Sequence, residues 1–252
     1  MRTMFIPIYK TMRYILLDTE TTGKDLEKSR VIQLAYKVYE GGKPKEFNGM
    51  FKPPIPIEIG AMAVHHTTNE DVEGKPEFST ILPELEELFD DETVAIAHNA
   101  SFDIKMMNNE GVYIPRHVCT YKVAYKLLPE QDANEGHSLQ ILRYALDLYK
   151  KEPKNLQAHD AMGDVIVLDH LFDYLCKRVM NAMNCDTFAA IEVMEKISAQ
   201  PILYRSWRFG KHKGQPIAGT DRGYMQWVLD NFSKKENPDE NLLYTMRHYL
   251  FK

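Results

Sequence analysis

The stretch LLDTETTG, residues 16–23, ends an apolar run with two acids and a glycine. Residues 14–18 (YILLD) are rich in strand-forming side chains, which predicts a buried strand. Side chains two residues apart on a strand share a face, so Asp18 and Glu20 should project together if the strand continues that far. Two like charges at the end of a buried strand require a compensating cation; the alternative is that both are solvated acids of a turn. Mg²⁺ and Mn²⁺ are the natural candidates, because both favour oxygen ligands.

Three initial strands followed by alternating helices and strands are typical of an α/β domain with a mixed sheet. We expect strands at 14–18, 31–39, 47–52, 93–97 and 116–119. We expect helices at 80–90, 102–110, 138–149, 160–180 and 187–197, with two more in the tail at 221–231 and 239–250. In residues 60–68 (GAMAVHHTT), we expect a turn of small residues before the two histidines.

The chain has 252 residues, of which 44% are hydrophobic and 27% charged, as in ordinary globular proteins. This length suggests one sizeable domain, or one domain with an appendage. The sequence has no apolar run near the ~18 residues of a membrane span, so we expect no membrane partner. Residues 1–12 are interpreted as an N-terminal extension, because they lack the features of a secretory signal. Three widely spaced cysteines form no metal or disulfide pattern, which favours the reducing cytoplasm.

Charge is distributed unevenly along the chain. The net charge of −5 argues weakly against a nucleic-acid partner. Residues 201–252, however, carry nine Lys or Arg and five Asp or Glu, whereas residues 1–200 carry 22 and 31. Both tryptophans, Trp207 and Trp227, also lie in this basic tail. The pattern fits a catalytic domain joined to a nucleic-acid-binding module, with chance asymmetry as the alternative.

A second polar segment, AIAHNASFD at residues 95–103, follows a predicted buried strand. Ligand sites of open α/β sheets lie at the carboxyl ends of strands, which would place Asp103 at the same rim as Asp18. In the alternative interpretation, Asn99 or Ser101 caps the next helix and Asp103 only favours its first turn.

A third segment, AHDAMGD at residues 158–164, precedes the long helix. His159 has a side chain suited to taking a proton from water, and Asp160 is its rival. Alternatively, both residues only start the helix. Asp164 lies among apolar residues, where an unpaired charge is costly to bury.

In order, the three segments read D-x-E, N-x-x-F-D and H-x-x-x-x-D. This resembles the histidine subclass of the DEDD exonuclease superfamily over residues 14–180. The sister subclass would need tyrosine at the position of Asp160. The resemblance implies a ribonuclease H-like α/β fold, a mixed five-stranded sheet flanked by helices, in a domain at 13–182.

The resemblance also implies roles for individual residues. Two divalent ions, Mg²⁺ or Mn²⁺, would be held by Asp18, Glu20, Asp103 and Asp164. His159 would be the general base in a 3′→5′ reaction that releases 5′-nucleoside monophosphates. The terminal nucleotides would be contacted by Thr21, Thr22, Met62, His65, Asn99 and Phe102. For Met62 and Phe102, ordinary core packing is an equal alternative.

Further stretches, among them QLAYKVYEGGK, VCTYKVAYKLLP, FGKHKGQPIA and GYMQWVLDNF, resemble the exodeoxyribonuclease X family. This resemblance implies that the substrate is DNA with single-stranded or duplex 3′ ends, in repair or end trimming. It also implies a small α+β C-terminal module at 204–252, joined by a helix and linker at 183–203. A homodimer is compatible with the family, although the sequence offers no interface.

The turn FGKHKG places Lys211 and Lys213 between two glycines as candidate DNA contacts. The alternative is a hairpin with solvated lysines. We expect Trp207 and Trp227 to be core anchors of the module rather than stacking platforms. Three other functions stay open: an exoribonuclease, a polymerase proofreading subunit, and a non-catalytic nucleic-acid-binding adaptor.

Overall fold

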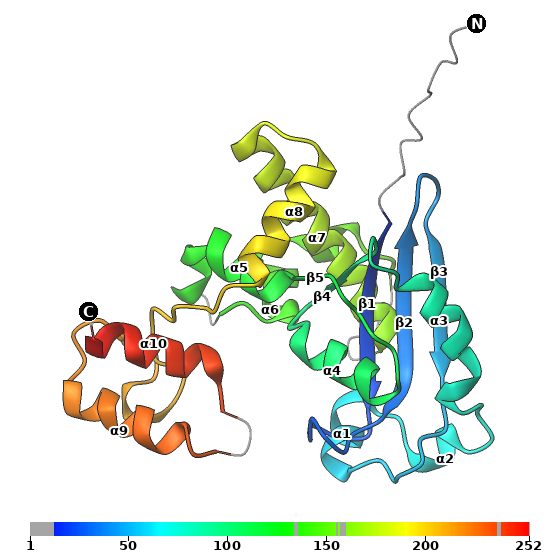
Figure 1. Ribbon diagram of the computed structural model, residues 1–252, viewed down its shortest axis with the longest axis horizontal. Coiled ribbons are helices and arrows are strands. Elements are labelled where there is room, and N and C mark those ends of the chain that lie inside the picture. The colour runs from blue at the N-terminus through cyan, green and yellow to red at the C-terminus, as the bar shows by residue number, and fades with distance from the viewer. Residues whose placement is uncertain (1–12, 134–135, 155, 157–159, 236–237, 252) are drawn as a thin grey trace, which may run out of the picture.

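The computed structural model describes residues 13–133, 136–154, 156, 160–235 and 238–251. His159 and the extension at 1–12 lie outside this part of the chain. One mixed sheet has the strand order β3-β2-β1-β4-β5. Its strands are β1 (Tyr14–Thr21), β2 (Val31–Tyr39), β3 (Lys45–Met50), β4 (Val94–Ala97) and β5 (His117–Cys119). The first three strands run antiparallel, and β4 and β5 run parallel to β1. The predicted mixed five-stranded sheet is confirmed (Figure 1).

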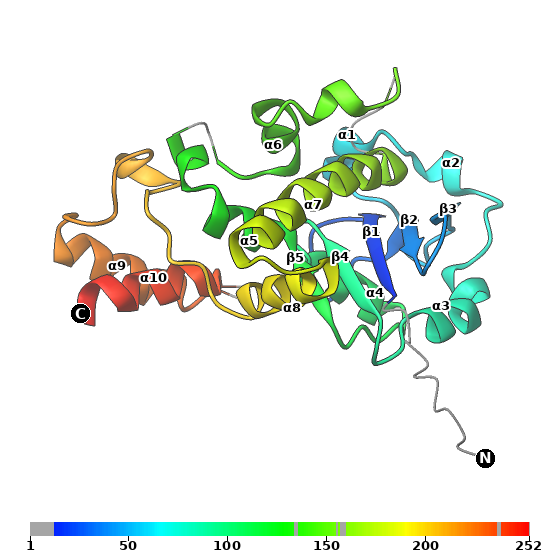
Figure 2. The same cartoon turned by 90° about the horizontal axis from the view of Figure 1, so that it is seen from above.

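Helices cover both faces of the sheet (Figures 1 and 2). The helices are α1 (Ile59–His65), α2 (Asn69–Val72), α3 (Leu82–Leu88), α4 (Ser101–Asn109), α5 (Thr120–Leu127), α6 (Leu139–Ala145), α7 (Ala161–Met183), α8 (Thr187–Ser198), α9 (Arg222–Phe232) and α10 (Glu240–Phe251). The long helix begins one residue after Asp160, close to the predicted start, and the two tail helices also lie where they were predicted.

Three expectations about helices were wrong or incomplete. Helix α1 replaces the turn expected in residues 60–68, and α5 was not predicted. The helix expected at 138–149 ends at Ala145, and Asp147 adopts a left-handed conformation (φ 56°) before a short 3₁₀ turn. A left-handed residue cannot continue a right-handed helix, which explains the break.

The alternation of β1 decides which helix meets each of its residues. Leu16 belongs to the core formed with α7 and α8, whereas Ile15 and Leu17 belong to the core formed with α3 and α4. Successive side chains on a strand point to opposite faces. Asp18 therefore projects toward α7, and Thr19 projects toward α4.

The C-terminal module has an apolar core of its own around Trp207, which is 2% exposed. Among the module's described residues, the β structure is one isolated bridge between Ser206 and Pro216. Helix α5 contributes Tyr125 to this core, and the Tyr125 hydroxyl accepts a hydrogen bond from the Arg205 backbone N–H at 2.8 Å. The module is thus seated on the helix that the sequence did not predict.

Trp207 is the core anchor that we expected, but Trp227 is not, because 53% of its surface is exposed. Trp227 lies on the outer face of α9, whereas Met225 and Val228 fill the buried face of that helix. The prediction that both tryptophans anchor the module was wrong for Trp227.

We propose the division of the chain at 13–182, 183–203 and 204–252 as a working description. Helix α8 packs into the same apolar core as α7, through Ala190, Ile191 and Met194.

In the described residues, no helix is both long and apolar enough to cross a membrane. The three cysteines are free thiols, and two of them are buried.

Candidate metal centre

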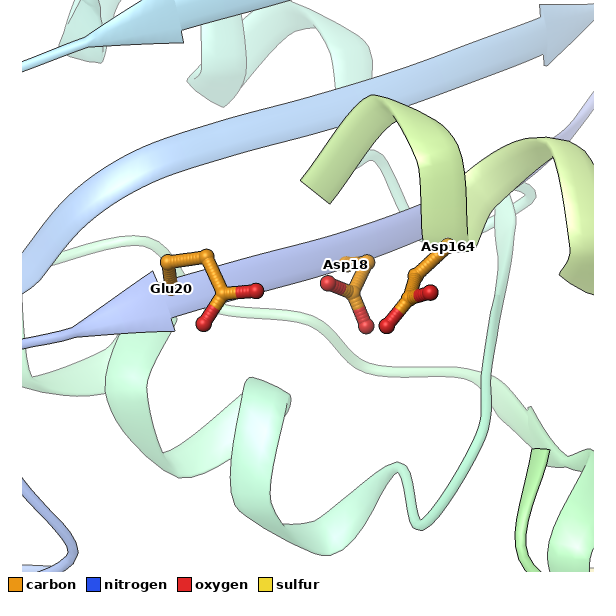
Figure 3. A group of neighbouring side chains, drawn as sticks. All are labelled: Asp18, Glu20 and Asp164. Carbon is orange, nitrogen blue, oxygen red and sulfur yellow. The ribbon is translucent and has the colours of Figure 1, made fainter. Parts of the chain in front are cut away.

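Three carboxylates converge where β1 passes the start of α7 (Figure 3). Asp18 and Glu20 come from β1, and Asp164 comes from the first turn of α7. One oxygen from each of the three lies within 4.8 Å of the others. Asp18 and Glu20 share a strand face, as predicted, and that face is the one covered by α7.

The start of α7 is held in place by a network around Gln33 of β2. Asp160 is the N-cap of α7, and its side chain accepts a hydrogen bond from the Gly163 N–H at 3.1 Å. The Gln33 side-chain amide donates to Asp160 at 2.8 Å and to Asn48 of β3 at 3.0 Å. These contacts tie the helix to the sheet and so fix the position of Asp164, which lies one turn later.

A second amide touches the centre directly. Gln140 of α6 donates from Nε2 to Oδ1 of Asp164 at 2.8 Å. An amide donor orients a carboxylate without neutralising its charge. The sequence reasoning missed both Gln33 and Gln140. Gln33 was visible only as one polar position on a strand, and no local pattern singled out Gln140.

The fourth predicted carboxylate, Asp103, lies on α4 on the other side of β1. It is 4% exposed, and its Oδ1 accepts hydrogen bonds from Thr19 N–H (3.1 Å) and Thr19 Oγ1 (2.8 Å). Asp103 is therefore close to the other three without belonging to their compact group. Helix α4 has Ala100 at its N-cap with no side-chain cap, so the capping alternative for Asn99 and Ser101 is not what the structure shows.

Electrostatics in the centre are unfavourable without a cation. Burial, followed by the charges of Asp103 and Asp164, raises the pKa of Asp18 well above its ordinary value. Burial and the charge of Asp164 raise the pKa of Glu20 to about 8. Burial raises the pKa of Asp103 to about 7, although the hydrogen bonds from Thr19 oppose this shift.

The neighbouring charges that raise the pKa of Asp18 most are all carboxylates, those of Asp103, Asp164, Glu20 and Asp160. Buried carboxylates are normally paired with cations or coordinate metals. The donor set is all oxygen, as Mg²⁺ and Mn²⁺ prefer. The residues present therefore fit a divalent ion.

The residues predicted to contact a nucleotide through side-chain polar atoms are partly used within the fold. Thr21 Oγ1 donates to the Gly23 carbonyl at 2.7 Å, and Thr22 Oγ1 accepts from the Arg30 N–H at 3.0 Å. His65 Nε2 donates to the Thr21 carbonyl at 3.2 Å, and His65 Nδ1 accepts from a backbone N–H at 3.0 Å. Because burial lowers the pKa of His65, the neutral ring with its proton on Nε2 satisfies both contacts.

The other residues predicted to contact the nucleic acid are more exposed to solvent. Met62 and Phe102 are half-buried against apolar clusters, and Asn99 is exposed in a left-handed conformation (φ 64°). Lys211 and Lys213 are exposed in the C-terminal module, whose helices α9 and α10 lie apart from the sheet (Figure 1). The structure thus brings the acids together and leaves the two lysines in a separate region.

A model of the RNase T family, described as "Exonuclease", matches residues 15–172, and this span contains all four carboxylates. The chain belongs to this exonuclease family. It is thus grouped with the DEDD-type 3′→5′ exonucleases that the sequence resembles.

Several known proteins are similar to the chain. Exodeoxyribonuclease 10 of Escherichia coli K12 is 29% identical over 239 residues, which cover 93% of this chain and 97% of the relative. DNA polymerase III subunit epsilon of Rickettsia prowazekii is 28% identical over 172 residues, or 64% of this chain and 73% of that protein. A solved structure of exonuclease X with 5′ overhanging duplex DNA has a TM-score of 0.56 at 27% identity, covering 74% of this chain and 99% of that one.

A structure of exonuclease I, at 22% identity and a TM-score of 0.53, shares the fold over 68% of this chain and 43% of its own length. Together with the sheet order, these likenesses confirm the predicted ribonuclease H-like exonuclease fold. The family's homologues are hydrolytic exonucleases, and the acidic cluster of this chain has the composition of their metal sites.

Proposed function

We propose that this protein is a metal-dependent 3′→5′ exodeoxyribonuclease that releases 5′-nucleoside monophosphates from DNA 3′ ends, in repair or end trimming. The convergence of Asp18, Glu20 and Asp164 within 4.8 Å carries the proposal, because burial and the neighbouring carboxylates together raise the pKa of Asp18. The similarity to exodeoxyribonuclease 10 over 93% of the chain supports DNA as the substrate.

In this proposal, Asp18, Glu20, Asp103 and Asp164 hold two divalent ions, Mg²⁺ or Mn²⁺. Such ions supply Lewis-acid stabilisation of the phosphodiester and lower the pKa of bound water. Gln140 and Gln33 hold Asp164 and the start of α7 in place. The carboxylates repel a phosphodiester when no ion is bound, so the metal-free protein binds substrate poorly.

His159 is the proposed general base, which accepts the proton of the attacking water. It precedes the α7 N-cap Asp160 in the sequence and lies outside the described residues. Asp160 itself is engaged as a helix cap, which favours His159 over Asp160 for this role.

The 3′-terminal nucleotide is proposed to lie beside Thr21, Thr22, Met62, His65, Asn99 and Phe102. Since the Thr21 and Thr22 hydroxyls and both His65 ring nitrogens already have partners, we assign these three residues to shaping the site. Exposed Asn99 and half-buried Met62 and Phe102 are left to contact the sugar or base. Lys211 and Lys213 are proposed to hold phosphates farther along the strand.

A time course on matched 5′-labelled DNA and RNA oligonucleotides, single-stranded and duplex, tests this function. We expect ladders that shorten from the 3′ end only with Mg²⁺ or Mn²⁺, DNA faster than RNA, and 5′-monophosphates as products. Preferential loss of RNA would instead indicate an exoribonuclease. Absence of cleavage by wild-type protein with both Mg²⁺ and Mn²⁺ would favour the non-catalytic adaptor, whereas cleavage without a metal ion would contradict the proposed metal dependence.

A proofreading subunit is a second candidate, favoured by the 28% identity to a polymerase III epsilon subunit. That similarity covers 64% of this chain. Stable co-purification with a replicative polymerase would support this candidate, whereas full activity of the isolated chain on free DNA ends favours the free-standing enzyme.

A further inference from the structure

The C-terminal module carries an exposed aromatic surface, which we call the α9 ledge and define as Tyr224, Trp227 and Lys211. Trp227 is 53% exposed, and Tyr224 is half-buried. The two rings lie three positions apart on α9, where side chains share a helix face. Their centroids are 5.8 Å apart with an interplanar angle of 22°, so the rings stack.

The ledge is rigidly supported from the module's core. Buried Trp207 meets Tyr224 edge-on at 5.1 Å, and His212 does the same at 4.7 Å. The indole N–H of Trp207 donates to Thr220 Oγ1 at 2.8 Å. Tyr224, on which Trp227 stacks, is therefore held in place by Trp207 and His212. More than half of the Trp227 surface is exposed to solvent.

The FGKHKG turn closes onto the same stack. Gly210 has a φ of 68°, and a Cβ at this position would lie 2.8 Å from the Tyr224 hydroxyl. Only glycine fits both constraints without strain. The closure brings the Lys211 ammonium to 5.0 Å from the centroid of the Tyr224 ring.

The charges around the ledge favour an anionic ligand. Lys211 and Lys213 are exposed and form no ion pair among the described residues. Asp230, one turn beyond Trp227, accepts a hydrogen bond from Gln226 at 2.8 Å. The residues from 201 to 252 carry a net charge of +4 in a chain of net −5, so the basic charge is concentrated in this module.

We infer that the α9 ledge binds unpaired bases of a single-stranded nucleic acid. One base stacks on the exposed face of Trp227, and Lys211 and Lys213 hold the neighbouring phosphates. Aromatic side chains flanked by cations bind single strands in this way with little sequence preference. The inference rests on the proposed function only for the choice of DNA as the strand, and it deepens that proposal by assigning a second contact outside the metal centre.

Intrinsic fluorescence can test the ledge because the chain has two tryptophans and Trp207 is buried. An Asp18→Asn background prevents cleavage during the titration. We expect dT12 to quench the fluorescence of this protein. Trp227→Phe should keep most of the affinity and lose the quenching. Trp227→Ala should weaken binding about 5- to 150-fold, measured with a labelled dT12 by anisotropy.

Phe251→Ala is the matched control, since Phe251 is an exposed aromatic (73%) on the neighbouring helix α10. It should leave the affinity for dT12 unchanged. The double variant Lys211→Ala/Lys213→Ala should reduce the slope of log K against log salt by about 1.4, which is two phosphate contacts on a single strand.

Two results would overturn the inference. One is an unchanged affinity of Trp227→Ala for dT12, and the other is quenching that persists in Trp227→Phe. Hydrolysis by wild-type protein of p-nitrophenyl thymidine 5′-phosphate, a minimal phosphodiester, reports on the metal centre separately. If dT12 binds and quenches Trp227 but no substrate is hydrolysed, the proposed function is refuted and the α9 ledge inference is retained. If substrate is hydrolysed but Trp227 has no effect on binding, the α9 ledge inference is refuted and the proposed function is retained.

Discussion

The metal centre and the α9 ledge are opposite kinds of surface. Around Asp18 the protein brings several like charges together in a half-buried site, and each neighbouring charge makes the next harder to ionise. Around Trp227 the aromatic rings and lysines are supported by the module's own core and are open to solvent. The crowded carboxylates of the first region favour binding of a divalent cation, whereas the aromatic rings of the second are held by the module's own core. Removing the ligand should therefore destabilise the first region and leave the second intact.

Asp18→Asn should have the largest effect. It removes one negative ligand from the centre at nearly constant volume, so we expect exonuclease turnover to fall about 1,000-fold or more, the equivalent of several kcal/mol of metal-ion catalysis. Single-turnover rates on a 5′-labelled oligonucleotide measure it. Asp173→Asn is the control, since half-buried Asp173 of α7 lies farther along the helix, pairs with Lys177 and should be dispensable. If Asp173→Asn lowered turnover as much as Asp18→Asn, the loss would not be specific to the metal centre.

Gln140→Ala should weaken apparent Mn²⁺ affinity about 10- to 100-fold, because outer-shell donors orient metal-binding carboxylates. The metal dependence of the cleavage rate measures this, and saturating Mn²⁺ should recover most of the rate. Gln226→Ala, which removes a similar amide–carboxylate contact on α9, should leave the metal dependence unchanged. If the two variants behave alike, Gln140 does not position Asp164 for an ion.

The metal-free protein should lose stability as the pH rises. The folded pKa values of Glu20 (about 8) and Asp103 (about 7) exceed their ordinary values of 4.5 and 3.8. The folded state therefore binds more protons than the unfolded state between pH ~4 and ~8, and the free energy of unfolding falls across this window. Thermal melts in chelator should show a decrease of Tm on the order of 5 °C between pH 6 and 8.

Added Mg²⁺ should reverse this decrease, and Glu20→Gln should flatten it. A metal-free Tm that rises from pH 6 to 8, or an identical profile in Glu20→Gln, would contradict the account of the acidic centre.

Asp160→Ala should have the smallest effect on activity. Loss of the α7 cap should cost about 1 kcal/mol of stability, measured by urea unfolding, while turnover stays within about 10-fold of wild type. A loss as large as that of Asp18→Asn would show that Asp160, rather than His159, serves the chemistry.

The sequence was sufficient for the parts of the fold that depend on local alternation. The period of β1 predicted that Asp18 and Glu20 share a face, and the strand–helix order predicted the mixed sheet. Helix α5 was missed because its sequence, TYKVAYKL, mixes β-branched and aromatic residues and follows β5 without a break. Its helical state depends on packing against α7 and α8, which is a tertiary contact.

The site was harder to predict from the sequence than the fold. Thr19 stands between the two acids and was ignored, yet it holds Asp103 on the far side of the strand. Gln140 reaches Asp164 from 24 residues away, and no local spacing could reveal such a contact. Trp227 was assigned to the core on hydrophobicity alone, although its position beside buried Val228 on α9 turns it outward.

Titration of the metal-free protein with Mn²⁺ by isothermal calorimetry tests the central claim most directly. If the clustered carboxylates form a divalent-ion centre, wild-type protein should bind two ions, and Asp18→Asn should lose at least one of them. Identical stoichiometry and affinity in wild type and Asp18→Asn would contradict the account, because the acids at the end of β1 would then have no cation to hold.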